Sequence, residues 1–289
     1  LKSLLKLQCR RCRRPDSPAG RWLREGGPGG TVHRKAPLWR LEVDVTARGI
    51  TFDFHNTIAA CESWFQLEVR QLVSAFLGWH AATYGTTLRP GAAAAADVAY
   101  RRLRQAIHIH GHELSAERCV ATVLEQIGIR VELSEIARGI DDLMREALEE
   151  ATPLAGAVET VRTLAEKGVS LGIVSSAVHH PFLEWTLERF GILDAFAVVT
   201  TSASSGYYKS RPEIYWQTLQ RLGAVPGESV HVGDSKRFDV GGAQRAGMRA
   251  ILVAADHDGP GVPGPVPDLV LPSLRDAAHR IMGVLEPVL

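Results

Sequence analysis

Short apolar runs alternate with segments of helically spaced hydrophobic residues along the second half of the chain. Such runs are typical of buried strands, and we expect strands there at 170–174, 196–199, 229–232, 250–253 and 269–271. A similar run predicts one earlier strand at 50–52. The helical spacing between them predicts helices at 155–167, 181–190, 212–222, 237–246 and 273–285. Strands that alternate with helices in this way favour a parallel sheet with right-handed crossovers.

The pattern changes between the first and second predicted strands. After a short turn at 58–63, apolar residues recur every three or four positions and predict helices at 64–84, 91–110, 115–127 and 133–150. No strand-like alternation interrupts residues 64–150. We therefore expect an all-helical insert within an otherwise alternating α/β chain.

The first 46 residues are rich in Arg, Pro and Gly and differ in charge from the rest. Residues 1–40 hold 11 Lys and Arg against 2 Asp and Glu, a local net of +9, so the remainder carries (33 − 11) − (32 − 2) = −8. Such a composition buries too little apolar surface to order itself. We interpret residues 1–46 as a disordered basic extension; the alternatives are a nucleic-acid contact or a targeting leader.

The overall composition, 45% hydrophobic and 22% charged, is that of a soluble globular protein. No stretch approaches the roughly 18 apolar residues of a membrane span. The four cysteines are too few and scattered for a disulfide framework, and the Cys9–Cys12 pair lacks a second pair at zinc-site spacing. We expect a cytoplasmic monomer or homodimer with neither a membrane nor a nucleic-acid partner.

Polar side chains follow several of the predicted strands. Asp53 follows 50–52 directly and precedes the turn residues Asn56 and Thr57. The other polar groups in such places are Ser175 and Ser176 after 170–174, Lys209 before the helix that starts at Pro212, Asp234 after 229–232, and Asp239 one helical turn later. Ligands of parallel sheets bind at the carboxyl ends of the strands. Taken singly, each residue could equally be an ordinary turn, cap or solvated side chain.

Taken in order, these residues resemble the motifs of the haloacid dehalogenase superfamily. The resemblance covers about residues 49–271, and its most specific parts are Gly233-Asp234 with Asp239 and the loop from Gly206 to Tyr215. It implies an α/β fold: a Rossmann-like, doubly wound parallel sheet with an inserted α-helical cap domain. Residues 47–62 and 151–289 would form the core, and residues 63–150 the cap, which would close over the site and determine specificity.

The resemblance also implies a reaction, the Mg²⁺-dependent hydrolysis of a small phosphorylated metabolite. Asp53 would attack phosphorus and form an aspartyl-phosphate intermediate, while Lys209 offsets negative charge. Ser175, Ser176 and Thr57 would bind the phosphoryl oxygens. Oxygen ligands suit Mg²⁺, and the expected metal site consists of Asp53, the backbone carbonyl of His55, Asp234 and, in a supporting position, Asp239.

His55 departs from the pattern of the phosphatases in this superfamily, which usually carry a second Asp there as the acid and base. An imidazole with its ordinary pKa of ~6.5 could donate or accept a proton near neutral pH. Two alternatives remain open: a non-catalytic relative that binds a phosphate ligand, and a haloacid dehalogenase. The second is less favoured, because Asp234 is present and the Tyr typical of dehalogenases is absent.

Two further features of the predicted insert leave alternatives open. His108, His110 and His112 alternate near a helix end, and they are either metal ligands or, as we favour, a polar helix terminus. Trp64, near the start of the insert, either lines the pocket or, as we favour, is a packed core aromatic.

Overall fold

A computed structural model describes residues 47–253 and 264–285, which fall within one compact unit, Glu42–Leu289. The predictions made for residues 1–46, including the Cys9–Cys12 pair, lie outside the described residues. No helix in the described part of the chain combines the length and the apolar character that a membrane crossing requires.

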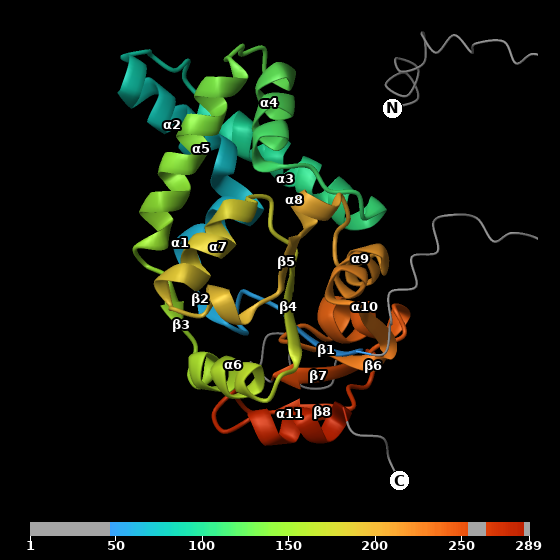
Figure 1. The fold of residues 1–289 in the computed structure, drawn as a ribbon. Helices are drawn as coiled ribbons and strands as arrows, with labels where there is room; N and C mark the ends of the chain where they lie inside the picture. The colour runs from blue at the N-terminus through green and yellow to red at the C-terminus, as the bar shows by residue number, and fades with distance from the viewer. Residues whose placement is uncertain (1–46, 254–263, 286–289) are drawn as a thin grey trace, which may run out of the picture. The chain divides into compact units, whose positions relative to one another are not determined.

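A six-stranded parallel sheet forms the centre of the fold (Figure 1). Its strand order is β5-β4-β1-β6-β7-β8. The strands are β1 (Ala47–Phe52), β4 (Ser170–Ser175), β5 (Val198–Thr201), β6 (Ala224–Gly233), β7 (Arg249–Val253) and β8 (Leu269–Leu271). Each predicted strand is present, with ends shifted by a few residues at β1, β5 and β6. The predicted α/β class with a Rossmann-like parallel sheet is therefore confirmed.

Helices cover both faces of the sheet, because successive strand residues point to opposite sides. Ile173 belongs to an apolar cluster with residues of α6 (Ala157–Glu166), α7 (His180–Arg189) and α11 (Ala278–Leu285). Its neighbour Val174 belongs to a second cluster with residues of α9 (Glu213–Leu222) and α10 (Gly241–Arg245). Burial on both faces explains why these strands read as nearly continuous apolar runs.

The elements of residues 62–148, which lie between β1 and β4, are all helices, as predicted. They are α1 (Glu62–Gln66), the π-helix η1 (Leu67–Gln71), α2 (Leu72–Tyr84), α3 (Ala92–His110), α4 (Ala116–Gln126) and α5 (Leu133–Leu148). Figure 1 shows α2 to α5, coloured teal to green, grouped together in the upper part of the view. The boundary between this helical segment and the rest of the unit stays a prediction.

The single helix predicted at 64–84 is wrong in detail. The chain forms α1, a π-helical turn and α2 in succession, and Gln71 leaves helical geometry at φ −120° and ψ 1°. A π-turn holds one residue more than an α-turn. The turn carries Glu68 in a buried position, where both carboxyl oxygens accept from the backbone N–H of Val178 at 3.0 Å. The π-helical turn therefore carries a hydrogen bond from Val178 to Glu68, which is distant in sequence.

The structure differs from the sequence prediction in several further elements. Within the expected turn at 58–63, β2 (Ala59–Ala60) pairs antiparallel with β3 (Thr152–Pro153), so the two ends of the helical segment meet. The helix predicted at 237–246 begins as the π-helix η3 (Lys236–Val240), and the one predicted at 273–285 begins at Ala278. An additional short helix, α8 (Ser202–Ser205), starts with a capping box between Thr201 and Ser204.

Candidate active site

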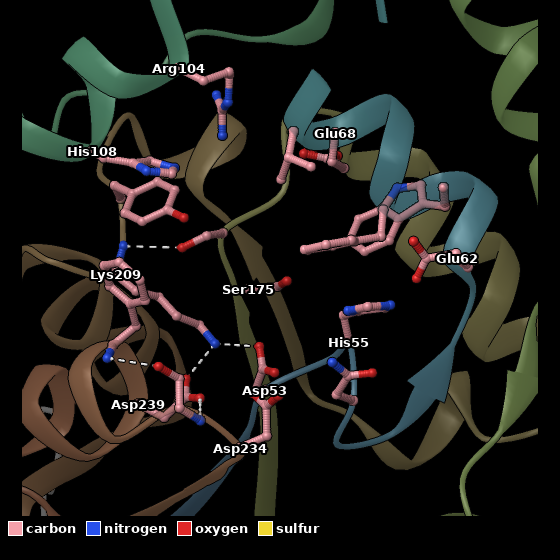
Figure 2. Close-up of a pocket in the computed structure, with 18 residues that line it drawn as sticks. Asp53, His55, Glu62, Glu68, Arg104, His108, Ser175, Lys209, Asp234 and Asp239 are labelled. Atoms are coloured by element: carbon pink, nitrogen blue, oxygen red, sulfur yellow. Dashed lines mark hydrogen bonds and ion pairs between the residues drawn. The ribbon is translucent and has the colours of Figure 1, made fainter. Parts of the chain in front are cut away.

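A cavity of ≈ 540 Å³ lies at the carboxyl ends of β1, β4 and β6. Its sheet wall consists of Asp53, His55, Asn56, Ser175, Ser176, Lys209, Asp234, Ser235 and Asp239. Its helix wall, contributed by α1, η1 and α3, consists of Glu62, Trp64, Phe65, Glu68, Val69, Arg104 and His108. Tyr208 and Phe238 complete the lining and pack against His108. Figure 2 shows the two walls facing each other.

Lys209 forms the centre of the sheet wall. Its ammonium donates to Asp53 Oδ1 and, at 2.6 Å, to Asp239 Oδ1 (Figure 2). All three side chains are buried. Burial alone would lower the pKa of Lys209, but the adjacent Asp239 and Asp53 raise it above its ordinary value. The lysine is therefore a fixed positive charge between two carboxylates.

Asp239 is held on several sides. Besides Lys209, its carboxylate contacts His231 Nε2 at 3.2 Å and accepts from the backbone N–H of Ser235 at 2.8 Å. Burial opposes ionisation, yet Lys209 and His231 bring the pKa of Asp239 well below its ordinary value. A Cβ at position 233 would clash with this carboxylate, so Gly233 is required there. Asp239 is therefore an ionised, immobile partner of Lys209.

Asp53 and Asp234 have the opposite character. Burial raises the pKa of Asp53 to about 6, with Asp239 adding to the shift and Lys209 opposing it. Burial, and repulsion by Asp53 and Asp239, raise the pKa of Asp234 to about 8. Each of the three carboxylates offers an oxygen within 4.8 Å of the others. One lysine thus does not offset their charge, and a hard divalent cation with oxygen ligands fits the set.

A tight turn presents the residues that follow Asp53. The Asp53 N–H donates to the Val232 carbonyl at 2.8 Å and ties the end of β1 to β6. Asn56 adopts φ 60°, in the left-handed region that Asn tolerates, and the N–H groups of Ile58 and Ala59 return to the Phe54 carbonyl. This turn directs the His55 ring into the cavity, where it stacks on Phe65 at 4.8 Å.

The three expected substrate-binding residues are placed differently from one another. Ser175 and Ser176 both line the cavity, and Ser176 Oγ accepts from the Lys209 backbone N–H at 3.3 Å. Thr57 does not line it; this buried hydroxyl donates to Asp53 Oδ2 at 3.4 Å. The structure therefore brings Thr57 to the carboxylate of Asp53 and brings the two serines to the open space.

The insert contributes residues that sequence reasoning did not assign or assigned differently. Trp64 is both packed and cavity-lining, with 2% of its surface exposed. His108 lines the cavity, while His110 is exposed. Within residues 47–253 and 264–285, Asp53, Asp234 and Asp239 form the only group of three or more potential metal ligands. The histidines therefore form no metal cluster there.

Glu68 and Arg104, also on the helix wall, were missed by the sequence analysis. Burial raises the pKa of Glu68 to about 8, although Arg104 opposes the shift. Arg104 forms a buried ion pair with Glu113, at 2.6 Å between Nη1 and Oε1. A weak signal existed for Arg104, since it shares a helix face with Tyr100 and Ile107, which are buried.

The sequence analysis also missed His231. Its signal was a polar residue inside the apolar run Val230-His231-Val232.

Solved structures with a similar fold include a haloacid dehalogenase-superfamily phosphatase from Thermococcus onnurineus, with a TM-score of 0.55 and 21% identity. A 2-haloacid dehalogenase from Pseudomonas syringae has a TM-score of 0.59 and 22% identity. The alignments cover 82% and 83% of this chain and 98% and 100% of those chains. Phosphatases and dehalogenases are both among these neighbours, so the likeness concerns the fold alone.

Sequence relatives include the haloacid dehalogenase-like hydrolase domain-containing protein 3 of Bos taurus, which is 31% identical over 57% of this chain and 67% of that protein. A glyceraldehyde 3-phosphate phosphatase of Methanopyrus kandleri is 30% identical over 53% of this chain. The alignment spans 65% of that second relative's length.

A family model described as haloacid dehalogenase-like hydrolase matches residues 98–253, more than half of the chain. The match includes Ser175, Lys209, Asp234 and Asp239, while Asp53 and His55 lie before it. The resemblance inferred from the order of these motifs is thus confirmed. The chain belongs to the haloacid dehalogenase-like hydrolase family.

Proposed function

We propose that the protein is a Mg²⁺-dependent phosphatase that hydrolyses a small phosphorylated metabolite through an aspartyl-phosphate intermediate. The observation that carries the proposal is the convergence of Asp53, Asp234 and Asp239 on one side of a cavity, with Lys209 between two of them. A nucleophilic carboxylate beside fixed positive charge is what phosphoryl transfer from a monoester requires.

In the proposed first step, a carboxylate oxygen of Asp53 attacks phosphorus and the bond to the leaving-group oxygen breaks. Lys209 offsets the charge of the phosphoryl group, and Ser175 and Ser176 donate hydrogen bonds to its oxygens. In the second step, water attacks phosphorus, the bond to Asp53 breaks, and inorganic phosphate leaves with Asp53 regenerated as a carboxylate.

His55 is the proposed proton carrier of both steps. As an imidazolium it donates a proton to the departing alkoxide, and as a neutral imidazole it accepts one from the attacking water. Its ring lies on the cavity wall two residues after Asp53, supported by stacking on Phe65. Each proton given to the leaving group is therefore recovered from the water that completes the cycle.

Asp53, Asp234 and the backbone carbonyl of His55 would hold Mg²⁺, with Asp239 in a supporting position through Lys209. The raised pKa values of Asp53 and Asp234, about 6 and about 8, support a site designed around an additional cation. When bound, the ion neutralises charge on the phosphoryl group as it is transferred.

Two further observations support the proposal over a dehalogenase. Relatives with phosphatase names include the glyceraldehyde 3-phosphate phosphatase and a ribulose-1,5-bisphosphate 5-phosphatase of Halopiger xanaduensis. Asp234, the carboxylate that a metal-independent dehalogenase does not need, lies beside Asp53.

We also propose residues 63–150 as the cap, since α1, η1 and α3 supply the helix wall opposite the sheet.

Turnover of an aryl phosphate with and without Mg²⁺ tests the function. We expect release of inorganic phosphate that requires the metal. Halide release from a 2-haloacid without metal would instead support the dehalogenase. The unusual His55 favours one second candidate, a non-catalytic phosphate-binding protein; binding of inorganic phosphate in calorimetry, with no turnover of aryl or acyl phosphates, would support it.

A further inference from the structure

The helix wall contains an Arg–His pair for which the reaction proposed above has no use. Arg104 and His108 lie four residues apart on α3 and thus on one helix face. Figure 2 shows Arg104 directed toward the cavity and His108 over its edge. Both pack on Tyr208: the His108 ring at 4.6 Å between centroids, the Arg104 Cζ at 6.0 Å. Because Tyr208 precedes Lys209, this pair adjoins the charged sheet wall.

The pair leaves hydrogen-bonding capacity unused. Arg104 Nε and His108 Nε2 are buried and have no hydrogen-bond partner among the described residues. Trp64 Nε1, on the same wall, is also buried without such a partner. Only 4% of Arg104 is exposed. Buried polar nitrogens without partners are rare and costly. Arg Nε–H and Trp Nε1–H can only donate, and His108 Nε2 donates in one of its two neutral tautomers.

The two buried carboxyl groups next to the pair, those of Glu113 and Glu68, already accept hydrogen bonds from the protein. Glu113 Oε1 accepts from Arg104 Nη1 at 2.6 Å and from the backbone N–H of Leu114 at 2.9 Å, and its Oε2 accepts from Ser202 Oγ at 2.8 Å. Both carboxyl oxygens of Glu68 accept from Val178. The unpartnered nitrogens of Arg104 and Trp64 are donors, so the ligand that complements them presents acceptor atoms.

We propose that the helix wall binds a carboxylate carried by the leaving group of the substrate, with Arg104 and His108 as the residues that recognise it. A carboxylate accepts hydrogen bonds without bringing donors of its own, whereas an amide or hydroxyl also brings donors, which Arg104 and Trp64 cannot accept. The substrate class is then the phosphate monoester of a hydroxycarboxylic acid. This assignment rests on the proposed phosphatase function.

The charges of the wall favour a monoanion over a second phosphate. Arg104 is the wall's fixed cation, and the carboxylates of Glu113 and of the exposed Glu62 offset its charge. Glu68, with a pKa of about 8, is mostly protonated at neutral pH, so it adds little repulsion and offers an O–H. A carboxylate brings one negative charge, while a second phosphate brings nearly two. Phe65 and Phe238 line the same cavity and suit a short carbon chain between the two anionic groups.

Non-hydrolysable ligands test the proposal without relying on turnover. The probes are 3-phosphonopropanoate and its amide, 3-phosphonopropanamide, together with the two- and four-carbon homologues, titrated by calorimetry in the presence of Mg²⁺. We expect the carboxylate of the best-fitting length to bind at least about tenfold more tightly than its amide, about 1.4 kcal/mol. This ratio should fall to about threefold or less in His108→Leu and in Arg104→Lys, which keeps the charge but loses the planar donor fork.

His110→Leu is the matched control, since His110 lies on the same helix and is exposed; the wild-type ratio should persist. If Arg104→Lys does not fold, the affinity ratio measured for His108→Leu still tests the proposal. Equal affinity for carboxylate and amide at every length in the wild type would overturn the proposal. Tighter binding of propane-1,3-diyl bisphosphonate than of the carboxylate would also overturn it and identify a second phosphate. Failure of the phosphatase function is seen separately, as absence of aryl phosphate turnover.

Discussion

The sheet wall and the helix wall of the cavity are built in different ways. On the sheet wall, Asp239 is held by hydrogen bonds with Lys209 and with His231, which does not line the cavity. The remaining imbalance is an excess of negative charge at Asp53 and Asp234. On the helix wall the imbalance is one of unpartnered donors at Arg104, His108 and Trp64. The first imbalance suits a cation and a phosphoryl group; the second suits the organic part of a substrate.

This difference separates reaction from selectivity. Changes on the sheet wall should alter the rate for every phosphate monoester, because every substrate presents the same phosphoryl group there. Changes on the helix wall should alter the ranking of substrates or the stability of the fold. The four predictions below test that separation, beginning with the largest expected effect.

Asp53→Asn should lower phosphatase activity by at least about three orders of magnitude for all substrates, because an amide is a far poorer nucleophile than a carboxylate. Steady-state rates on one aryl and one alkyl phosphate measure this. The melting temperature should stay close to the wild-type value, since the exchange is isosteric. Activity within about threefold of the wild type would remove Asp53 from the nucleophile role.

Asp234→Ala should reduce activity by on the order of a hundredfold and weaken the response to Mg²⁺, because this carboxylate is a proposed metal ligand. Rates measured across a Mg²⁺ titration give both effects. Asp194→Ala is the control, since Asp194 is an exposed carboxylate paired with Arg162. An unchanged Mg²⁺ titration curve for Asp234→Ala would show that the metal binds elsewhere.

His55→Asp should raise the turnover of alkyl phosphates by about tenfold and that of aryl phosphates less, because a poor leaving group depends most on a proton donor. The comparison uses wild type, His55→Asp and His55→Ala on one substrate of each kind between pH 5 and 8. Equal rates for all three proteins on the alkyl phosphate would contradict a proton-transfer role and favour the phosphate-binding candidate.

Glu68→Gln should change how stability depends on pH. The pKa of Glu68 is raised from 4.5 to about 8 in the folded protein, so between these values the folded state binds more protons than the unfolded state. The free energy of unfolding therefore falls as pH rises through this window, by up to about 1.3 kcal/mol per pH unit. Glu68→Gln removes this contribution.

Urea unfolding at pH 5.5, 6.5 and 7.5 measures the slope of stability against pH. Wild type should lose stability more steeply than Glu68→Gln across this range. Glu228→Gln, a change in an exposed ion pair with Arg48, should keep the wild-type slope. Parallel slopes for wild type and Glu68→Gln would show that Glu68 is ionised in the folded protein.

Most of the sheet wall could be predicted because its signals are local. Asp53 and Asp234 each follow a buried apolar strand, and parallel strands bring their carboxyl ends to one edge. Asp239 follows Asp234 by little more than one helical turn, so local geometry brings it back to the same place. Thr57 shows the limit of this reasoning: its position in the turn was clear, but only the packed structure placed it behind Asp53.

The helix wall could not be predicted, because its contacts join residues that are distant in sequence. Glu68 meets Val178 across 110 residues, and a π-turn rather than a regular helix holds it there. Trp64 looked like a packed aromatic and is one, yet it also lines the cavity. Helical periodicity indicates which side of a helix is buried, but not which neighbour or cavity that side meets.

By itself, the sequence determined the strands, the helical insert and the motif residues at the strand ends, since these depend on local apolar patterns and short spacings. The tertiary structure alone decided that Lys209 lies between Asp53 and Asp239. It also decided that Arg104 and His108 face that site across one cavity. Burial is the physical reason: it removes water from these groups, so their charges and unpartnered donors depend on neighbours that only the folded chain supplies.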